Sequence, residues 1–224
     1  LTYWSDQNGM VSVSNPTAIA VSGTYYIKGS PATGCTDIKP VKVVISPLPI
    51  LTITTPAPVC MPGTVDLTAP AVTAGSSSGG TYTYWKDAAA TIILPSPNAV
   101  AASGTYYIKI VVAGGCSTIQ PVNVTINPLP ISYAGSDVVI CTGDNAALGT
   151  TATANYSYSW SPATGLSNAN ISNPTVSLTN LGKVPVSSDY IVTTTNTLTN
   201  CVSRDTVKVT VNSVPTVNAG SAAS

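Results

Sequence analysis

The sequence contains no histidine, no glutamate and no phenylalanine, and only 7% of its 224 residues are charged. Histidine and glutamate carry much of the acid–base chemistry of enzymes, and Ser-His-Asp and Cys-His arrangements need a histidine. The 8 basic and 8 acidic residues balance, so the chain has no electrostatic attraction for nucleic acid or an anionic membrane. These absences predict a protein that is not an enzyme and has no nucleic-acid partner.

Long apolar runs and metal-binding spacings are missing as well. No apolar run approaches the roughly 18 residues that span a bilayer. There is no Cys-x-x-Cys pair and no Asp-x-Asp-x-Asp-Gly loop. The sequence therefore predicts no membrane span, no metal and no cofactor. The chain opens at Leu1 without a signal-peptide pattern, so we expect any targeting signal to lie outside it.

Threonine, serine, valine and alanine dominate the composition, with 18 prolines and 17 glycines. Beta-branched residues favour strands, and glycine and proline favour the turns between them. No segment has a helical pattern. The composition therefore predicts an all-β chain.

The chain repeats itself. Residues 22–28, Ser-Gly-Thr-Tyr-Tyr-Ile-Lys, recur as residues 103–109, and residues 47–50, Pro-Leu-Pro-Ile, recur as residues 128–131. In both cases the copies are 81 positions apart, and no gap is needed between them. Such self-similarity is typical of tandem structural repeats.

A third, more diverged copy follows. Val-Thr-Ile-Asn at residues 124–127 returns as Val-Thr-Val-Asn at 209–212, and Ala-Gly-Ser at 134–136 returns at 219–221. We predict a partial repeat over residues 1–48, whole repeats over 49–130 and 131–215, and the start of another over 216–224. The Pro-Leu-Pro joints predict short, stiff connections because proline fixes φ.

Each repeat has the size and pattern of an immunoglobulin-like domain. In the middle copy, strand-like runs cover residues 50–54, 64–69, 82–85, 91–94, 105–112 and 122–126. Six or seven strands in a repeat of this length predict tandem immunoglobulin-like antiparallel β-sandwich domains. We expect Trp85 and Trp160 to be the buried tryptophans of their third strands.

Strand alternation sorts the aromatic residues of the sixth strand. Lys109 should face water, so Tyr107 shares its face while Tyr106 points inward. Tyr106 and its counterparts Tyr25 and Tyr190 are candidates for a tyrosine corner. If Trp85 also points inward, two exposed pairs are expected on the outer face, Tyr84 with Tyr107 and Tyr3 with Tyr26.

Five cysteines lie at the ends of predicted strands. Cys60 and Cys141 precede the second strand, and Cys35, Cys116 and Cys201 follow the sixth. One of each kind per repeat predicts the pairs Cys60–Cys116 and Cys141–Cys201, with the partner of Cys35 upstream of Leu1. In a regular sandwich these strand ends lie at opposite ends, beyond the ~7 Å that a disulfide tolerates. Either the strand ends are displaced, so that the pairs within a repeat can form, or the bridges join neighbouring repeats, as Cys60 with Cys201 would.

Several motifs resemble the Ig-like or PKD-like repeats of very large secreted surface proteins of Bacteroidota, including gliding-motility-type adhesins exported by the type IX system. They are Tyr-Trp-x-Asp at residues 84–87, Ser-Gly-Thr-Tyr-Tyr-Ile-Lys, the Gly-Cys before the last strand, and Tyr-Ser-Trp-Ser-Pro-Ala-Thr-Gly-Leu at 158–166. The resemblance covers nearly the whole chain and implies an extracellular, cell-surface location. It also implies O-glycosylation at Asp-Thr followed by an aliphatic residue, which makes Thr206 a candidate.

From these observations we expect a structural stalk or filament segment of a surface adhesin. Its partners would be neighbouring repeats of the same long chain, with lateral self-association through the tyrosine pairs. Two alternatives stay open. The chain could bind a surface glycan or protein directly, or it could be an accessory region of a secreted enzyme.

Overall fold

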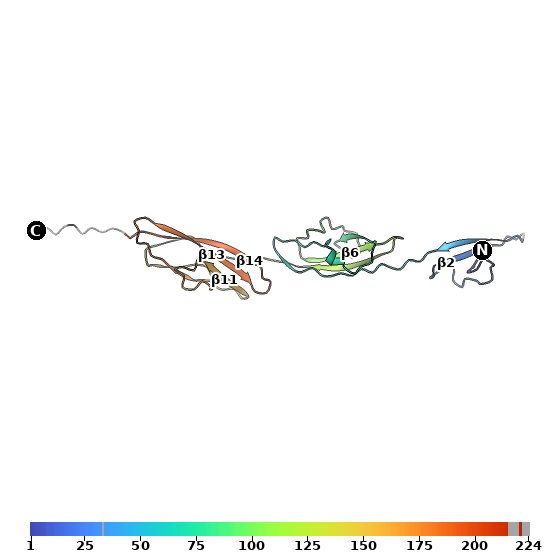
Figure 1. The fold of residues 1–224 in the computed structure, drawn as a ribbon, viewed down its shortest axis with the longest axis horizontal. Helices are drawn as coiled ribbons and strands as arrows, with labels where there is room; N and C mark the ends of the chain where they lie inside the picture. The colour runs from blue at the N-terminus through green and yellow to red at the C-terminus, as the bar shows by residue number, and fades with distance from the viewer. Residues whose placement is uncertain (33, 215–219, 221–224) are drawn as a thin grey trace. The chain divides into compact units, whose positions relative to one another are not determined.

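The computed structural model describes residues 1–32, 34–214 and 220, and strands dominate it (Figure 1). By its internal contacts the chain divides into two compact units. The first unit comprises Leu1–Thr54, Pro70–Pro95 and Tyr106–Val122, and the second comprises Thr55–Ala69, Ser96–Thr105 and Asn123–Ser224. The predicted start of another repeat at 216–224 lies outside the described residues except for Gly220, and the repeat boundaries stay predictions.

Two three-stranded antiparallel sheets form most of the first unit, and they are copies of one another. In one, Tyr3 pairs with Ile27, and in the other, Tyr84 pairs with Ile108, so the 81-residue offset is kept in the register. A 3-10 helix, η1, covers Pro70–Thr73. The first sheet contains β1 (Thr2–Trp4), β2 (Gly23–Gly29) and β3 (Asp37–Val43), and the second contains β5 (Thr81–Trp85), β6 (Gly104–Val111) and β7 (Ser117–Val124).

The second unit holds a complete sandwich together with a short parallel pair of strands. The sandwich has a four-stranded sheet in the order β11-β13-β14-β9 and a two-stranded sheet β10-β12. The parallel pair joins β4 (Val59–Cys60) to β8 (Ile126–Asn127). The sandwich strands are β9 (Val138–Ile140), β10 (Asn145–Ala147), β11 (Tyr156–Ser161), β12 (Thr175–Ser177), β13 (Val186–Asn196) and β14 (Val202–Val211).

The order of these strands confirms the predicted fold class. An immunoglobulin-like sandwich places its third, sixth and seventh strands on one sheet and its second and fifth on the other. Here β11, β13 and β14 form the first group and β10 and β12 the second. The chain is therefore all-β and immunoglobulin-like. No helix in the described part of the chain is long and apolar enough to cross a membrane.

The core of this sandwich contains the tryptophan expected on its third strand. Trp160 is 3% exposed, and its indole N–H donates to the Ile171 carbonyl at 2.9 Å. Tyr190 is also buried, and its hydroxyl donates to the Thr164 carbonyl at 2.6 Å. The remaining large core side chains are Ile140, Leu148, Val176, Val192, Val207, Val209 and Val211.

In the middle repeat the register reverses two of the predicted orientations. Tyr84 lies opposite Ile108, which is fully buried, whereas Trp85 lies opposite Tyr107. Directly opposite residues of an antiparallel pair point to the same face. Tyr84 is therefore on the inner face and Trp85 on the outer face, so the predicted buried Trp85 and the predicted pair of Tyr84 with Tyr107 were both wrong.

The first repeat shows the same arrangement. Trp4 lies opposite Tyr26, and Tyr3 lies opposite Ile27. Tyr3, Tyr25 and Ile27 together line a cavity of about 140 Å³, which places Tyr3 on the inner face. The predicted pair of Tyr3 with Tyr26 was therefore wrong as well.

The tyrosine corner is present at one of its three predicted positions and absent at another. The Tyr25 hydroxyl donates to the carbonyl of Val21, four residues upstream, at 2.9 Å, as a tyrosine corner does. The Tyr190 hydroxyl instead binds Thr164, on a distant segment. The prediction is confirmed for Tyr25 and wrong for Tyr190.

Some predicted strands are not regular strands. Residues 50–54, 64–69 and 91–94 pair only through single bridges and isolated hydrogen bonds, such as the Val65–Val100 bridge. The segment paired with residues 64–69 contains Pro97, which accepts from the Leu67 N–H but has no N–H to donate to a ladder. The predicted strands at 82–85 and 105–112 correspond to β5 and β6.

Candidate functional site

The cysteines and hydroxyl donors that recur from repeat to repeat lie at two joints. Each joint consists of a Pro-Leu-Pro segment and the hairpin loop beside it. The first joint contains residues 46–50 and 112–118, all in the first unit. The second joint contains residues 127–131 and 196–203, together with Cys60, all in the second unit.

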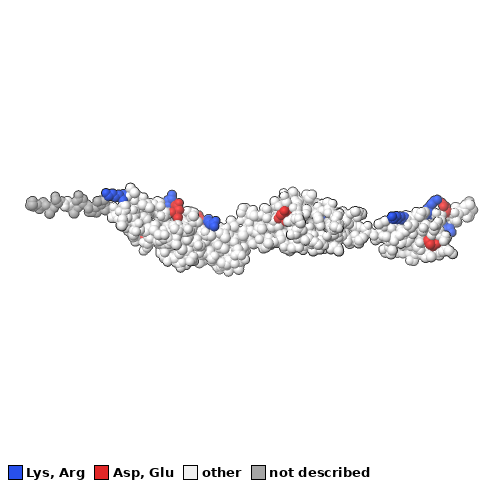
Figure 2. Space-filling model, in the orientation of Figure 1, with Lys and Arg blue, Asp and Glu red and all other residues white. Residues whose placement is uncertain are grey.

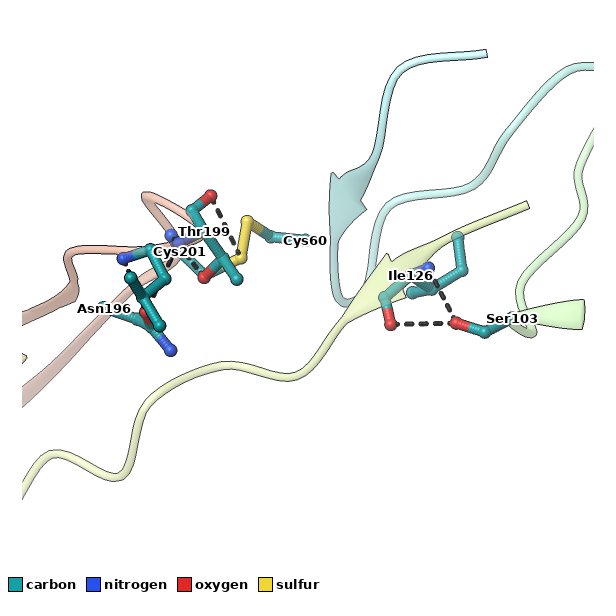
Figure 3. The surroundings of a disulfide bond; sticks show 7 residues. Cys60, Ser103, Ile126, Asn196, Thr199 and Cys201 are labelled. Atoms are coloured by element: carbon teal, nitrogen blue, oxygen red, sulfur yellow. Dashed lines mark hydrogen bonds between the residues drawn. A yellow bond between two sulfur atoms is a disulfide. The ribbon is translucent and has the colours of Figure 1, made fainter. Parts of the chain in front are cut away.

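A disulfide closes the second joint. Cys60, from the middle repeat, is bonded to Cys201, from the third repeat, and their Cα atoms are 5.6 Å apart (Figure 3). Cys201 is fully buried. The bridge therefore links two successive repeats through residues 141 positions apart in the sequence.

Parallel pairing brings Cys60 to the joint. Cys60 is the register partner of Asn127, and the backbone N–H of Met61 donates to the Asn127 carbonyl at 2.9 Å. Asn127 directly precedes the Pro-Leu-Pro segment. The strand start that carries Cys60 therefore lies where the middle repeat ends.

A tight hairpin brings Cys201 to the same place. The loop between β13 and β14 is closed by the Asn196 N–H, which donates to the Cys201 carbonyl at 2.9 Å. Two residues further on, the Ser203 hydroxyl donates to the carbonyl of the buried Pro130 at 2.7 Å. The hairpin is thus held against the last residue of the Pro-Leu-Pro segment.

The first joint has the same hydrogen bonds. The Thr118 hydroxyl donates to the carbonyl of the buried Pro49 at 2.6 Å, as Ser203 does to Pro130. The Val112 N–H donates to the Cys116 carbonyl at 3.0 Å, which closes the hairpin between β6 and β7. The Cys116 thiol lies 3.6 Å from the carbonyl oxygen of Ser46.

The predicted cysteine pairs were therefore wrong. Cys60–Cys116 and Cys141–Cys201 are not formed, and Cys35, Cys116 and Cys141 are free thiols. A regular sandwich places the two kinds of cysteine of one repeat at opposite ends, beyond the reach of a disulfide. The link between neighbouring repeats, the alternative that this geometry suggested, is the one observed.

A second candidate site is formed by two aromatic pairs on the outer sheet faces, Trp85 with Tyr107 and Trp4 with Tyr26. All four side chains are half-buried. Both indole N–H groups donate to a threonine hydroxyl two residues earlier, at 2.9 Å in each repeat. Sequence reasoning found the right faces for Tyr26 and Tyr107 but chose the wrong neighbours for them.

An aspartate closes the loop that follows each of these tryptophans. In the middle repeat, the backbone N–H groups of Ile92 and Thr91 donate to the Asp87 carboxylate, the first of them at 2.7 Å. The Ile92 bond is the main reason that the pKa of Asp87 is lowered. Asp6 does the same in the first repeat, where the N–H of Val11 is the main cause of its lowered pKa.

The remaining candidate residues are dispersed. Thr206 is exposed on β14 opposite Ile191, and its glycosylation stays a prediction. Charged side chains are sparse and scattered on the face in Figure 2. The ion pair of Lys39 with Asp37, at 3.2 Å, is highly exposed and adds little to stability. Over the described residues, no three cysteines or aspartates gather as metal ligands would.

Comparison with known proteins gives structural similarity only. No protein-family profile and no curated protein matches the sequence. The chain is similar to the two-domain structure of DIP-gamma Ig1+Ig2, with a TM-score of 0.38 and 12% identity over 74% of this chain and 98% of that one. It is similar to Sidekick-1 immunoglobulin domains 1–4, with a TM-score of 0.38 and 10% identity over 94% of this chain and 67% of that one.

A bacterial structure shows a weaker similarity. The chain covers 48% of SGBP-B from Bacteroides ovatus, solved with a mixed-linkage heptasaccharide, at a TM-score of 0.23 and 14% identity over 73% of this chain. Since all these TM-scores are below 0.5, the fold assignment rests on the strand order and the similarities carry no argument about function.

Proposed function

We propose that this chain is a structural stalk segment of a secreted bacterial surface adhesin, and that its joints transmit tension from one repeat to the next. The observation that carries the proposal is the disulfide between Cys60 and Cys201. A bridge between two domains adds nothing to the core of either one. It ties the two repeats together across their connection, which carries the same force as the domains when the chain is pulled at its ends.

The bridge changes the path of a force applied to the chain ends. A pull entering at Cys60 leaves at Cys201 through the sulfur atoms, so the backbone between them carries no load. That segment spans 141 residues, and a fully extended residue covers at most about 3.4 Å, so about 480 Å of chain is withheld from extension. Most of two sandwiches is thereby protected from mechanical unfolding.

Single-molecule pulling on the whole chain, held at its two ends, tests this role. Under oxidising conditions we expect the total extension to be about 480 Å shorter than in the presence of a thiol reductant. The Cys201→Ser variant should give the long extension in both conditions. Equal extensions of the oxidised and reduced wild-type chain would contradict the proposal.

The proposed location is the cell surface. Disulfides persist in oxidising compartments, and a bridge that protects against tension has a use outside the cell. The motifs that resemble Bacteroidota surface repeats support this location and that bacterial group. Labelling intact cells of the source bacterium with an antibody to this chain should stain the surface, whereas staining only after lysis would contradict it. The proposal assigns no catalytic role to any residue.

A direct binding module is the second candidate, and one observation favours it. Trp85 and Tyr107 lie side by side on the outer sheet face, and aromatic rings are suited to stacking on sugars and to protein contacts. Half-buried rings that recur on the outer face of successive repeats would add weak contacts into avidity. In this reading the chain binds a surface glycan, a protein or a neighbouring stalk.

A further inference from the structure

We infer that Cys141 and Cys116 are attachment sites for further repeats, each one half of a disulfide of the Cys60–Cys201 type. We call the cysteine before the second strand of a repeat, such as Cys60, its early cysteine, and the one after the sixth strand, such as Cys201, its late cysteine. By this rule the early cysteine of every repeat bonds to the late cysteine of the repeat that follows it. Cys141 would form a disulfide with the late cysteine of a following repeat. Cys116 would form a disulfide with the early cysteine of a preceding repeat. The inference rests on the proposed stalk function, which it extends from one joint to every joint.

The strand that leads into Cys141 is paired in the same way as the strand that leads into Cys60. Before Cys60, Val59 pairs in parallel with Ile126, and before Cys141, Ile140 pairs in parallel with Val211. Each cysteine is then the first residue of a four-residue turn closed by one backbone hydrogen bond, although the turns differ, since Met61–Pro62 is a cis peptide and Gly143 has a φ of 84°. The Gly63 N–H donates to the Cys60 carbonyl at 2.8 Å, and the Asp144 N–H donates to the Cys141 carbonyl at 3.1 Å. Cys141 is exposed, so its thiol is open to a partner.

The surroundings of Cys116 point to a missing partner in a defined place. In the second joint, Asn127 pairs with Cys60, the cysteine that Cys201 binds. The residue equivalent to Asn127 in the first joint is Ser46, and the Cys116 thiol lies 3.6 Å from its carbonyl oxygen. Cys116 therefore lies next to the position that an early cysteine paired with Ser46 would occupy, as Cys201 lies next to Cys60.

Two repeated hydrogen bonds confirm that Ser46 and Asn127 are equivalent. The Ser22 hydroxyl accepts the Ile45 N–H at 2.7 Å, and the Ser103 hydroxyl accepts the Ile126 N–H at 2.8 Å (Figure 3). Each bond fixes the residue that directly precedes Ser46 or Asn127. Both joints thus have the same frame, and only the second contains both cysteines.

The bond-forming step is an ordinary thiol oxidation. Two thiols lose two protons and two electrons to form one S–S bond, and a low-molecular-weight disulfide such as oxidised glutathione is reduced to two thiols. The product is a series of overlapping loops, because the loop from Cys60 to Cys201 encloses Cys141, where the next loop begins. A pull on such an array meets a bridge at every joint.

Two extended chains test the inference, one at each end. In the first, a copy of residues 137–214 follows Ser221, which supplies a following repeat with its own late cysteine. In the second, a copy of residues 50–81 precedes Leu1, which completes the first repeat and supplies an early cysteine. Both are oxidised in a glutathione buffer, the free thiols are alkylated, and the disulfides are mapped by mass spectrometry.

In the first chain we expect a disulfide between the added late cysteine and Cys141. In the second chain we expect a disulfide between the added early cysteine and Cys116. Cys35, which already lies in the same repeat as the added early cysteine, should stay alkylated. With Cys141→Ser or Cys116→Ser, the added cysteine should become a free thiol.

An added cysteine bonded within its own repeat, or left free beside an intact Cys60–Cys201 bridge, would overturn the inference and leave the stalk proposal standing. Loss of the Cys60–Cys201 bridge from the unextended chain would overturn both. If one added repeat fails to fold, the other chain still decides the pairing rule.

Discussion

Trp85 lies opposite Tyr107 across β5 and β6, on the outer face of its sheet. In the third repeat, Trp160 lies opposite Val192 across β11 and β13, on the inner face. The residue of the middle repeat that occupies the place of Trp160 is Tyr84, which lies opposite the buried Ile108. The two tryptophans therefore make different contributions to stability.

Replacing each tryptophan by alanine should separate these contributions. Trp160→Ala removes a buried ring and should lower the free energy of unfolding of its repeat by about 3–5 kcal/mol. Trp85→Ala removes a half-buried cross-strand partner and should cost about 1 kcal/mol or less. Calorimetry of the whole chain measures both. Equal losses in the two variants would contradict the register.

The sequence is sufficient for the fold class and for the repeat, because alternation and turn residues are local signals. It leaves the register of β5 open, because Tyr82, Tyr84 and Trp85 put aromatic residues on both faces. A one-residue shift exchanges the two faces of a strand. The prediction matched Trp85 to Trp160 because both are tryptophans, and this match displaced the predicted register of β5 by one residue.

The cysteine pairing depends on a relationship that the local sequence does not contain. Cys60 reaches the joint through parallel pairing with Asn127, which is 67 positions later in the chain. The presence of one cysteine of each kind in every repeat does not show at which end of the sandwich each cysteine lies. The distance argument against pairing within a repeat was the informative signal, because it follows from the fold itself.

Removing the Cys60–Cys201 bridge should destabilise the second unit. A closed loop of 141 residues contributes about 5 kcal/mol in the chain-entropy description, less any strain. We expect Cys60→Ser, Cys201→Ser and the double variant to lose the same amount, because each removes the same bond. Denaturant unfolding with and without a reductant measures the loss. A double variant much less stable than either single variant would show that the two sulfur atoms act separately.

The two hydroxyl groups that donate to the Pro-Leu-Pro segments should contribute about equally to the free energy of unfolding. Thr118→Val and Ser203→Ala each remove a donor to a buried proline residue, so each should cost about 1 kcal/mol. The exposed Ser159 provides the control, and Ser159→Ala should change little. Hydrogen exchange of the amides in each joint should speed up only in the matching variant. Unchanged exchange in both joints would mean that the segments are held by packing alone.

Acid should open the loop after Trp85. The pKa of Asp87 is below its ordinary value of 3.8, chiefly because the Ile92 N–H donates to its carboxylate. A lowered pKa in the folded state means that the stabilisation is complete above about pH 4 and is lost as the pH falls through the folded-state pKa. The amide signals of Thr91 and Ile92 should shift in that range in an NMR titration. In Asp87→Asn they should show no such transition, and a transition that survives this change would exclude Asp87 as its cause.

The outer-face aromatic pairs decide between a passive stalk and one that also binds. Trp85 and Tyr107 form one pair and Trp4 and Tyr26 the other, whereas the third repeat has Ser161 opposite Ile191 at the equivalent place. Replacing all four aromatic residues by serine should lower thermal stability modestly, since each cross-strand pair is worth about 0.2–1 kcal/mol. If the pairs also bind, the same variant should lose lateral self-association in sedimentation and adhesion to glycan-coated or protein-coated surfaces. Val139→Ser, which removes an exposed apolar side chain of β9, is the matched control and should leave both unchanged. Association and adhesion that persist in the fourfold variant, while its stability falls, would reduce the pairs to cross-strand stabilisers and leave tension as the only role of these repeats.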